Sequence, residues 1–232
     1  HKRQQIFLWS THWGLLALWM SCAVAGAGSP AALPWLPGAL PVVFLLQEVF
    51  MSQYNIAVIV GSLRKDSFNR KLATGLARLA PADFRFTQVR LDDLPLYNQD
   101  DDGQQAASVL RLKGEIKAAQ GLLFVTPEYN RSIPGVLKNA IDHASRPYGQ
   151  SAWAGKPAGV IGASVGAIGT AMAQQHLRNV LAYLDVPTLG QPEGFIHAKE
   201  GLFDADGGIG EASREFLQGW VNQYVAWVKK HA

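Results

Sequence analysis

Short apolar runs alternate with segments of helical spacing from Met51 to the end of the chain, and this alternation limits the fold more than any other feature. The run over 54–60 is continuously apolar after its first residues, which is typical of a strand buried on both faces of a sheet. The sequence predicts strands over 54–60, 84–91, 121–126 and 158–163, a weaker strand near Thr188 or Phe195, and helices over 68–79, 104–119, 135–145, 170–184 and 210–230.

Strands that alternate with helices form a parallel sheet with helices on both faces, because each crossover helix packs back onto the sheet. Right-handed crossovers leave two common strand orders, and five strands suit the order 2-1-3-4-5. We therefore predict an α/β fold of the doubly wound, flavodoxin-like class with a five-stranded parallel sheet. Ligands of such sheets bind beyond the carboxyl ends of the strands, where the strand order switches.

Residues 1–50 differ from the rest of the chain. Lys2 and Arg3 precede a mostly apolar run over 6–25, and small residues follow it, which is the outline of a secretory signal peptide or of a short membrane anchor. The chain begins with His1 rather than Met, and four prolines between residues 30 and 41 disfavour a regular helix there. We expect residues 1–50 to be a leader outside the domain, appended, mis-started or targeting, and residues 51–232 to be the working domain.

Charge and cysteine content exclude several function classes. The chain has 21 basic and 18 acidic side chains, and the net charge of +3 is too small for a nucleic-acid-binding protein. A single cysteine, Cys22, cannot form an internal disulfide, a Cys-ligated zinc site or an iron–sulfur cluster. We predict no metal site, no nucleic-acid partner and no membrane contact for the domain. Any redox chemistry must then come from a bound cofactor.

The loop after the first strand has the residues of a phosphate site. Residues 61–70, GSLRKDSFNR, run from a buried strand into a helix, and the N–H groups at a helix start attract anions. Gly61 permits a sharp turn, Arg64 supplies a charge that suits phosphate, and Ser67 is placed to cap the helix. The loop lacks the GxGxxG and GxxxxGK[ST] fingerprints, so a mononucleotide phosphate fits it better than a dinucleotide.

Two further loops follow the third and fourth strands and should lie at the same edge of the sheet. Residues 126–135, TPEYNRSIPG, are stiffened by two prolines, so their backbone amides can bond the edge of a flat heterocycle while Tyr129 packs against its face. Residues 164–170, SVGAIGT, contain two glycines that allow a ligand to approach closely. The competing interpretations are a rigid connector with an exposed tyrosine and a helix entry with small packing residues.

Residues 54–185 resemble the NADPH-dependent FMN reductase family, in particular its quinone and chromate reductase branch. The segments that carry the resemblance are GSLRKDSFNRKLA from Gly61, LPLYNQD from Leu94, PEYNRSIPGVLKNAIDHASRP from Pro127 and GASVGAIGTAMAQQHLR from Gly162. They occur in the family's order and cover most of the domain.

The resemblance implies a bound FMN and assigns a role to each loop. The residues implied to hold the FMN phosphate are Ser62, Arg64, Ser67 and Asn69. Those implied to border the isoalloxazine ring, chiefly through backbone amides, are Pro127, Glu128, Tyr129, Asn130 and Arg131. Ser164 and Gly166 are implied to close the site near the flavin.

The resemblance also implies the reaction and the partners. NADPH or NADH would give a hydride to flavin N5, and two electrons would pass to a quinone, free flavin or another small acceptor such as a metal oxyanion. The family forms homodimers or homotetramers, and Tyr97 and Asn98 are candidates to reach the site of a partner subunit. We expect a cytoplasmic protein, because export would conflict with loading of FMN.

Two other functions remain open at this point. The first is a flavodoxin-like FMN electron carrier without NAD(P)H oxidoreductase activity, which the slightly basic charge disfavours because such carriers are typically acidic. The second is a flavodoxin-like module without redox function. His143, His176 and His197 lie outside the three loops, so we expect no chemical role for them.

Overall fold

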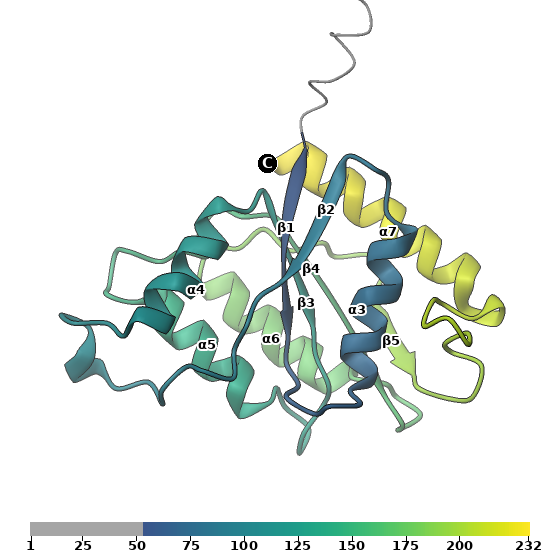
Figure 1. Cartoon of the computed structure of the whole chain (residues 1–232), viewed down its shortest axis with the longest axis horizontal. Coiled ribbons are helices and arrows are strands. Elements are labelled where there is room, and N and C mark those ends of the chain that lie inside the picture. Colours follow the sequence, from purple (N-terminus) through teal and green to yellow (C-terminus); the bar gives the residue numbers. More distant parts are fainter. Residues whose placement is uncertain (1–52) are drawn as a thin grey trace, which may run out of the picture. The chain divides into compact units, whose positions relative to one another are not determined.

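The computed structural model describes residues 53–232, so the leader predicted over 1–50 lies outside the described residues. Strands and helices alternate along the chain (Figure 1). The strands are β1 (Tyr54–Val60), β2 (Phe84–Gln88), β3 (Gly121–Val125), β4 (Ala158–Ser164) and β5 (Gly194–His197). The helices are α3 (Phe68–Leu79), α4 (Ala107–Ala118), α5 (Gly135–Ser145), α6 (Ala171–Tyr183) and α7 (Glu211–His231), with a short 3₁₀ helix, η2 (Gln99–Asp101), before α4.

The five strands are parallel and lie in the order β2-β1-β3-β4-β5, which confirms the predicted flavodoxin-like sheet. Helices α3 and α7 cover one face, and α4, α5 and α6 cover the other (Figure 1). Each face has its own apolar core. One contains Leu72, Trp220 and Tyr224, and the other contains Phe124 and Trp153.

Strand β2 is shorter than the predicted run over 84–91. Its pairing with β1 ends at Gln88, opposite Val58, while the last residues of β1 pair only with β3. Val89 and Leu91 are nevertheless buried in the core beneath α4 and α5. The alternation of apolar residues therefore predicted burial correctly but predicted too long a strand. The chain leaves the sheet after Gln88, while the side chains of Val89 and Leu91 still reach the core.

Other differences lie at element ends. Helix α4 begins at Ala107 rather than Gln104. The short helix η2 was not predicted, and Asn98 caps it by accepting a hydrogen bond from the N–H of Asp100 at 3.2 Å. The fifth strand is at Gly194–His197, while Thr188 makes an isolated parallel bridge to Ala158. Among residues 53–232, no helix is both long enough and apolar enough to cross a membrane.

Candidate functional site

The carboxyl edge of the sheet brings the three predicted loops into one pocket. Their order in the sheet makes this necessary, because β1, β3 and β4 are neighbours and all end at this edge. The residues that line the pocket are Ser62, Arg64, Ser67, Phe68, Asn69, Pro127, Glu128, Tyr129, Ala163, Ser164 and Val165. Its volume of about 170 Å³ is below the roughly 300–1,000 Å³ of pockets that enclose a ligand, so a large ligand would be only partly covered.

Most of the predicted site residues line this pocket, and three do not. Asn130 and Arg131 form the turn just beyond it, and Gly166 directly follows Val165, the last lining residue of the third loop. Phe68, Ala163 and Val165 line it without having been predicted, because apolar and small residues carry no chemical signal in a sequence. Tyr97 and Asn98 are absent from its lining, and the ring of Tyr97 packs edge-on against His143 at 5.3 Å.

The first loop presents donors at the start of α3. Ser67 is the N-cap, and its Oγ accepts a hydrogen bond from the N–H of Arg70 at 3.3 Å. A helix start leaves its first N–H groups without intrahelical acceptors, so those of Phe68 and Asn69 remain available to a ligand. The buried Ser62 accepts from the N–H of Arg64 at 3.4 Å and keeps its own proton to donate.

Asn69 connects two of the loops. Its Nδ2 donates to the carbonyl of Ala163 and its Oδ1 accepts from the N–H of Ala163, both at 2.9 Å. This pair of bonds fixes the start of α3 against the end of β4. The side chain therefore positions the pocket wall, and one amide hydrogen remains for a ligand.

The second loop ends in a two-residue turn of unusual composition. Tyr129 and Ser132 exchange backbone hydrogen bonds of 3.0 Å in both directions. Asn130 and Arg131 between them have φ values of 51° and 64°, which is the geometry of a type I′ hairpin turn. The turn leaves the Tyr129 ring partly exposed at the pocket.

Two side chains fasten the second loop to α6. Oε2 of Glu128 accepts from the N–H groups of Met172 and Ala173 at 3.0 and 3.1 Å, which supplies the cap that Thr170 does not provide. A carboxylate at a helix N-terminus also interacts favourably with the helix dipole. His176 contacts Ser132 at 3.0 Å between Nδ1 and Oγ. This contact joins His176 of α6 to the second loop, although the two residues lie 44 positions apart in the sequence.

The third loop is held by a hydrogen bond between two of its own residues. Oγ of Ser164 accepts from the N–H of Gly166 at 3.1 Å, so the two residues form one turn. Gly169 has a φ of 60°, and a Cβ there would lie 2.7 Å from the backbone of Phe195. Glycine is required at this position because the loop passes directly over β5.

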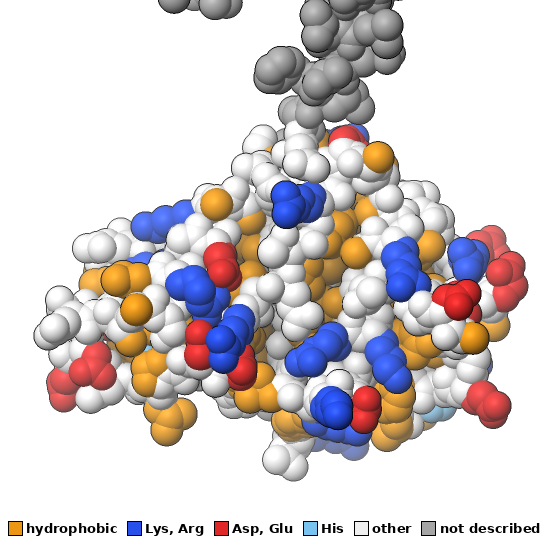
Figure 2. All heavy atoms as spheres, in the orientation of Figure 1, with side chains coloured by type: hydrophobic (Ala, Val, Ile, Leu, Met, Phe, Trp, Pro, Cys, Tyr) orange, Lys and Arg blue, Asp and Glu red, His pale blue; other side chains and the backbone are white. Residues whose placement is uncertain are grey.

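The electrostatic character of this edge is positive. Arg64, Lys65 and Arg70 form no ion pair within residues 53–232, and Figure 2 shows Lys and Arg side chains gathered over the loop after β1. In the same range, no group of three or more His, Cys, Asp and Glu side chains is arranged to hold a metal ion. Of these three cations, Arg64 lines the pocket, which is therefore suited to an anionic organic ligand.

Comparison with known proteins agrees with this geometry. The family model for NADPH-dependent FMN reductase matches residues 54–201. A 2-hydroxy-1,4-benzoquinone reductase from a Burkholderia species is 57% identical over 175 residues, which cover 75% of this chain and 96% of the relative. A quinone reductase from Pseudomonas putida is 48% identical over 181 residues, 77% of this chain and 97% of the relative.

A solved structure is similar over the same region. FerB, a flavoenzyme NAD(P)H:(acceptor) oxidoreductase from Paracoccus denitrificans, has 47% sequence identity and a TM-score of 0.74, and the match covers 77% of this chain and 98% of that one. The fold, the loops at the carboxyl edge and the extent of these matches lead to one assignment: the chain belongs to the NADPH-dependent FMN reductase family.

Proposed function

We propose that this chain is an NAD(P)H-dependent FMN reductase that passes two electrons to quinones and to other small acceptors. The observation that carries the proposal is the single pocket lined by the loops after β1, β3 and β4. Membership of the family supports the cofactor and the donor, and the names of the Burkholderia and Pseudomonas relatives support a quinone acceptor.

The residues of the pocket fit FMN. The Ser62 and Ser67 hydroxyls, the free N–H groups at the start of α3 and the charge of Arg64 make a donor set suited to a phosphate monoester. Asn69 would complete this set with its remaining amide hydrogen. When bound, FMN supplies hydride acceptance from a nicotinamide and electron transfer to the acceptor.

The second and third loops would hold the ring and leave one side open. We propose that the backbone of residues 127–131 borders the ring, that Tyr129 packs on it, and that Ser164 and Gly166 close the site. Glu128 would act through its two bonds to α6, which fix the loop before any ligand arrives. The chain needs no general base for this reaction, because its residues only bind, orient and partly cover the flavin.

The rim of the pocket suits a planar apolar acceptor. Large apolar side chains are exposed on all three loops and at the start of α6: Leu63, Tyr129, Val165, Ile168 and Met172. Exposed apolar groups that gather around a binding site favour apolar ligands, because contact removes them from water. We propose quinones as the main acceptors, with free flavin and metal oxyanions such as chromate as further ones.

The proposal extends to the organisation of the protein. We propose that residues 51–232 are the working reductase, that it acts as a homodimer or homotetramer in which Tyr97 and Asn98 approach a partner's site, and that it is cytoplasmic. The exposed Leu96 beside Tyr97 supports the proposed contact between subunits. The need to load FMN before any export supports the cytoplasmic location.

An anaerobic visible spectrum of the FMN-loaded protein tests the function. We expect NADPH to bleach the flavin absorbance and a benzoquinone to restore it within the same cuvette. A flavin that neither NADPH nor NADH bleaches would indicate an electron carrier instead. Failure to bind FMN at all would contradict the assignment of the three loops.

A further inference from the structure

A second cleft adjoins the flavin pocket at the loop after β1, because Ser62 lines both. It opens where β2 leaves β1 at Gln88, and its volume is about 460 Å³. The side chains that line it include Ser62, which also lines the flavin pocket, and the charged residues Lys65, Arg70, Arg90 and Asp92. A ligand that extends from the flavin pocket would therefore meet three cations and one carboxylate.

Two of the three cations of this cleft have no acidic partner in the described part of the chain. Lys65 and Arg70 form no ion pair within residues 53–232, and Nε of Arg70 is buried without a hydrogen-bond partner in that range. A buried donor without a partner is destabilising unless a ligand or water satisfies it. The donor set is thus incomplete in the protein alone.

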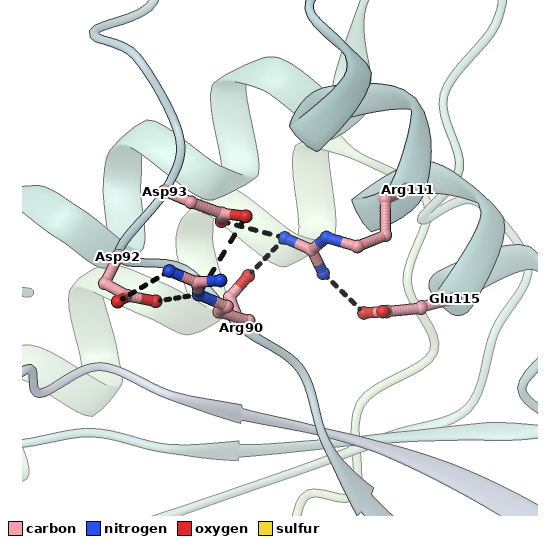
Figure 3. A network of polar contacts seen from close by, with 5 residues as sticks. All are labelled: Arg90, Asp92, Asp93, Arg111 and Glu115. Atoms are coloured by element: carbon pink, nitrogen blue, oxygen red, sulfur yellow. Dashed lines mark hydrogen bonds and ion pairs between the residues drawn. The ribbon is translucent and has the colours of Figure 1, made fainter.

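Arg90, which lines the cleft, is held in place by a polar network (Figure 3). Its Nε and Nη2 donate to the two oxygens of Asp92 at 2.7 and 3.3 Å. Arg111 donates from Nη2 to the carbonyl of Arg90 and to Asp93, both at 2.9 Å, and pairs through Nη1 with Glu115. The carboxylate of Asp92 is therefore paired with Arg90, whereas Nη1 of Arg90 has no partner among residues 53–232.

We propose that this cleft is a subsite for a phosphate monoester, held by Lys65, Arg70 and Arg90, and that its ligand is the 2′-phosphate of NADPH. The proposal rests on the proposed function, and it identifies the residues by which the protein would select NADPH over NADH as electron donor. A phosphate monoester carries between about 1.5 and 2 negative charges at neutral pH, which matches an excess of cations. Arginine pairs well with phosphate because its planar donors bond two oxygens at once.

The flavin phosphate is the rival ligand for this cleft, and the geometry disfavours it. The flavin pocket already offers the N-terminus of α3, two serine hydroxyls and Arg64. Arg64 and Ser67 do not line the cleft, and Arg90 does not line the flavin pocket, so a flavin phosphate held in the cleft would leave Arg64 and Ser67 unused. NADH lacks the 2′-phosphate, so only NADPH would gain from the subsite.

Titration calorimetry on the FMN-loaded protein tests the subsite without turnover. The probes are adenosine 2′,5′-bisphosphate, 5′-AMP and inorganic phosphate. The variants are Lys65→Gln and Arg90→Gln, and the matched control is Lys71→Gln, an exposed lysine of α3 outside the cleft lining. We expect each cleft variant to weaken the bisphosphate about tenfold and to leave 5′-AMP unchanged, as loss of one charge-assisted contact predicts.

Steady-state kinetics provide the second measurement. KM for NADPH should rise by the same factor in the cleft variants, whereas KM for NADH and both kcat values should stay as in the wild type. Equal losses for the two adenosine probes, a loss of FMN affinity, or phosphate binding without any advantage for the bisphosphate would each overturn the proposal. If neither nucleotide reduces the flavin, the proposed function fails; if both do with an unchanged KM ratio, only this inference fails.

Discussion

Arg131 has a backbone conformation that its side chain disfavours. Its φ of 64° lies in the left-handed region, next to Asn130 with a φ of 51°. Asn tolerates this region because its short polar side chain bonds locally, whereas Arg gains no such compensation. Strained residues gather at functional sites, where the surrounding structure holds them. The strain at Arg131 therefore agrees with its place in the loop that we propose borders the flavin ring.

Arg131→Gly should stabilise the protein without FMN by about 0.5–1 kcal/mol, because glycine adopts the left-handed region without a steric penalty. The lost ion pair to Glu128, 3.6 Å long and largely exposed on the arginine side, should cost little. Urea denaturation measures the change in the free energy of unfolding. Asn130→Gly is the control and should gain less. A larger gain at Asn130 than at Arg131 would contradict this account.

Arg64 is the residue through which the phosphate site is most directly tested. Its side chain is exposed and forms no ion pair within residues 53–232, so its removal should leave the fold intact. We expect Arg64→Ala to weaken FMN binding about three- to tenfold, which is the loss of one partly solvated charge-assisted contact. Quenching of flavin fluorescence measures the Kd. Arg85→Ala, an exposed arginine on β2, is the control, and an equal effect there would refute a specific contact.

Helix α7 joins the sheet by close packing at one glycine and one tyrosine. A Cβ on Gly159 of β4 would lie 2.6 Å from Cδ2 of Tyr224, so the absence of a side chain lets the ring settle on the sheet. Tyr224 stacks on Trp220 with ring centroids 5.6 Å apart, and its hydroxyl donates to the carbonyl of Leu122 at 2.9 Å. Burial raises the pKa of Tyr224 well above its usual value.

Tyr224→Phe should lower the free energy of unfolding by about 1 kcal/mol near neutral pH, because the Leu122 carbonyl loses its donor. Above pH 10 the unfolded tyrosine ionises while the buried one stays protonated, so the wild type loses stability as pH rises. The variant lacks this contribution, and the difference should shrink by up to about 1.4 kcal/mol per pH unit. Urea denaturation at pH 8 and 10.5 checks this. A difference that stays constant would contradict it.

The molecule as a whole exposes an apolar region beside α5 and α6. A groove of about 610 Å³ runs between these helices, and Tyr148 and Tyr183 in its lining are 85% and 83% exposed. Leu96, next to Tyr97 of the same lining, is 86% exposed. Large apolar side chains that gather in one region of a surface mark interaction sites, and this region lies on the same part of the fold as the predicted cross-subunit residues.

Light scattering should give a particle of two or four chains of 25.2 kDa each. Tyr183→Ser should shift the particle towards the monomer at low protein concentration, because it removes an exposed aromatic anchor from the proposed interface. Phe216→Ser on α7, on the opposite face of the sheet, is the control and should not change the mass. A wild-type monomer at every concentration would contradict the proposed oligomer.

Local sequence determined the type and order of the elements. Apolar runs identified β1, β3 and β4 because buried parallel strands need apolar residues on both faces, and the helical spacing of 68–79 and 135–145 matched α3 and α5. The alternation of strands and helices then fixed the sheet class and which loops meet at the carboxyl edge. The polar and charged residues on those loops were sufficient to identify most of the pocket lining.

Tertiary structure alone decided which contacts span long stretches of chain. The bonds from Glu128 to α6, from Asn69 to Ala163 and from His176 to Ser132 join residues 44 to 94 positions apart, and no local pattern encodes them. The cleft of Lys65, Arg70 and Arg90 exists because β2 leaves β1 at Gln88. That divergence depends on how residues 89–91 pack under α4 and α5. Burial in a core and pairing in a sheet both favour apolar residues, so the sequence pattern is the same in the two cases and only the neighbours in space differ.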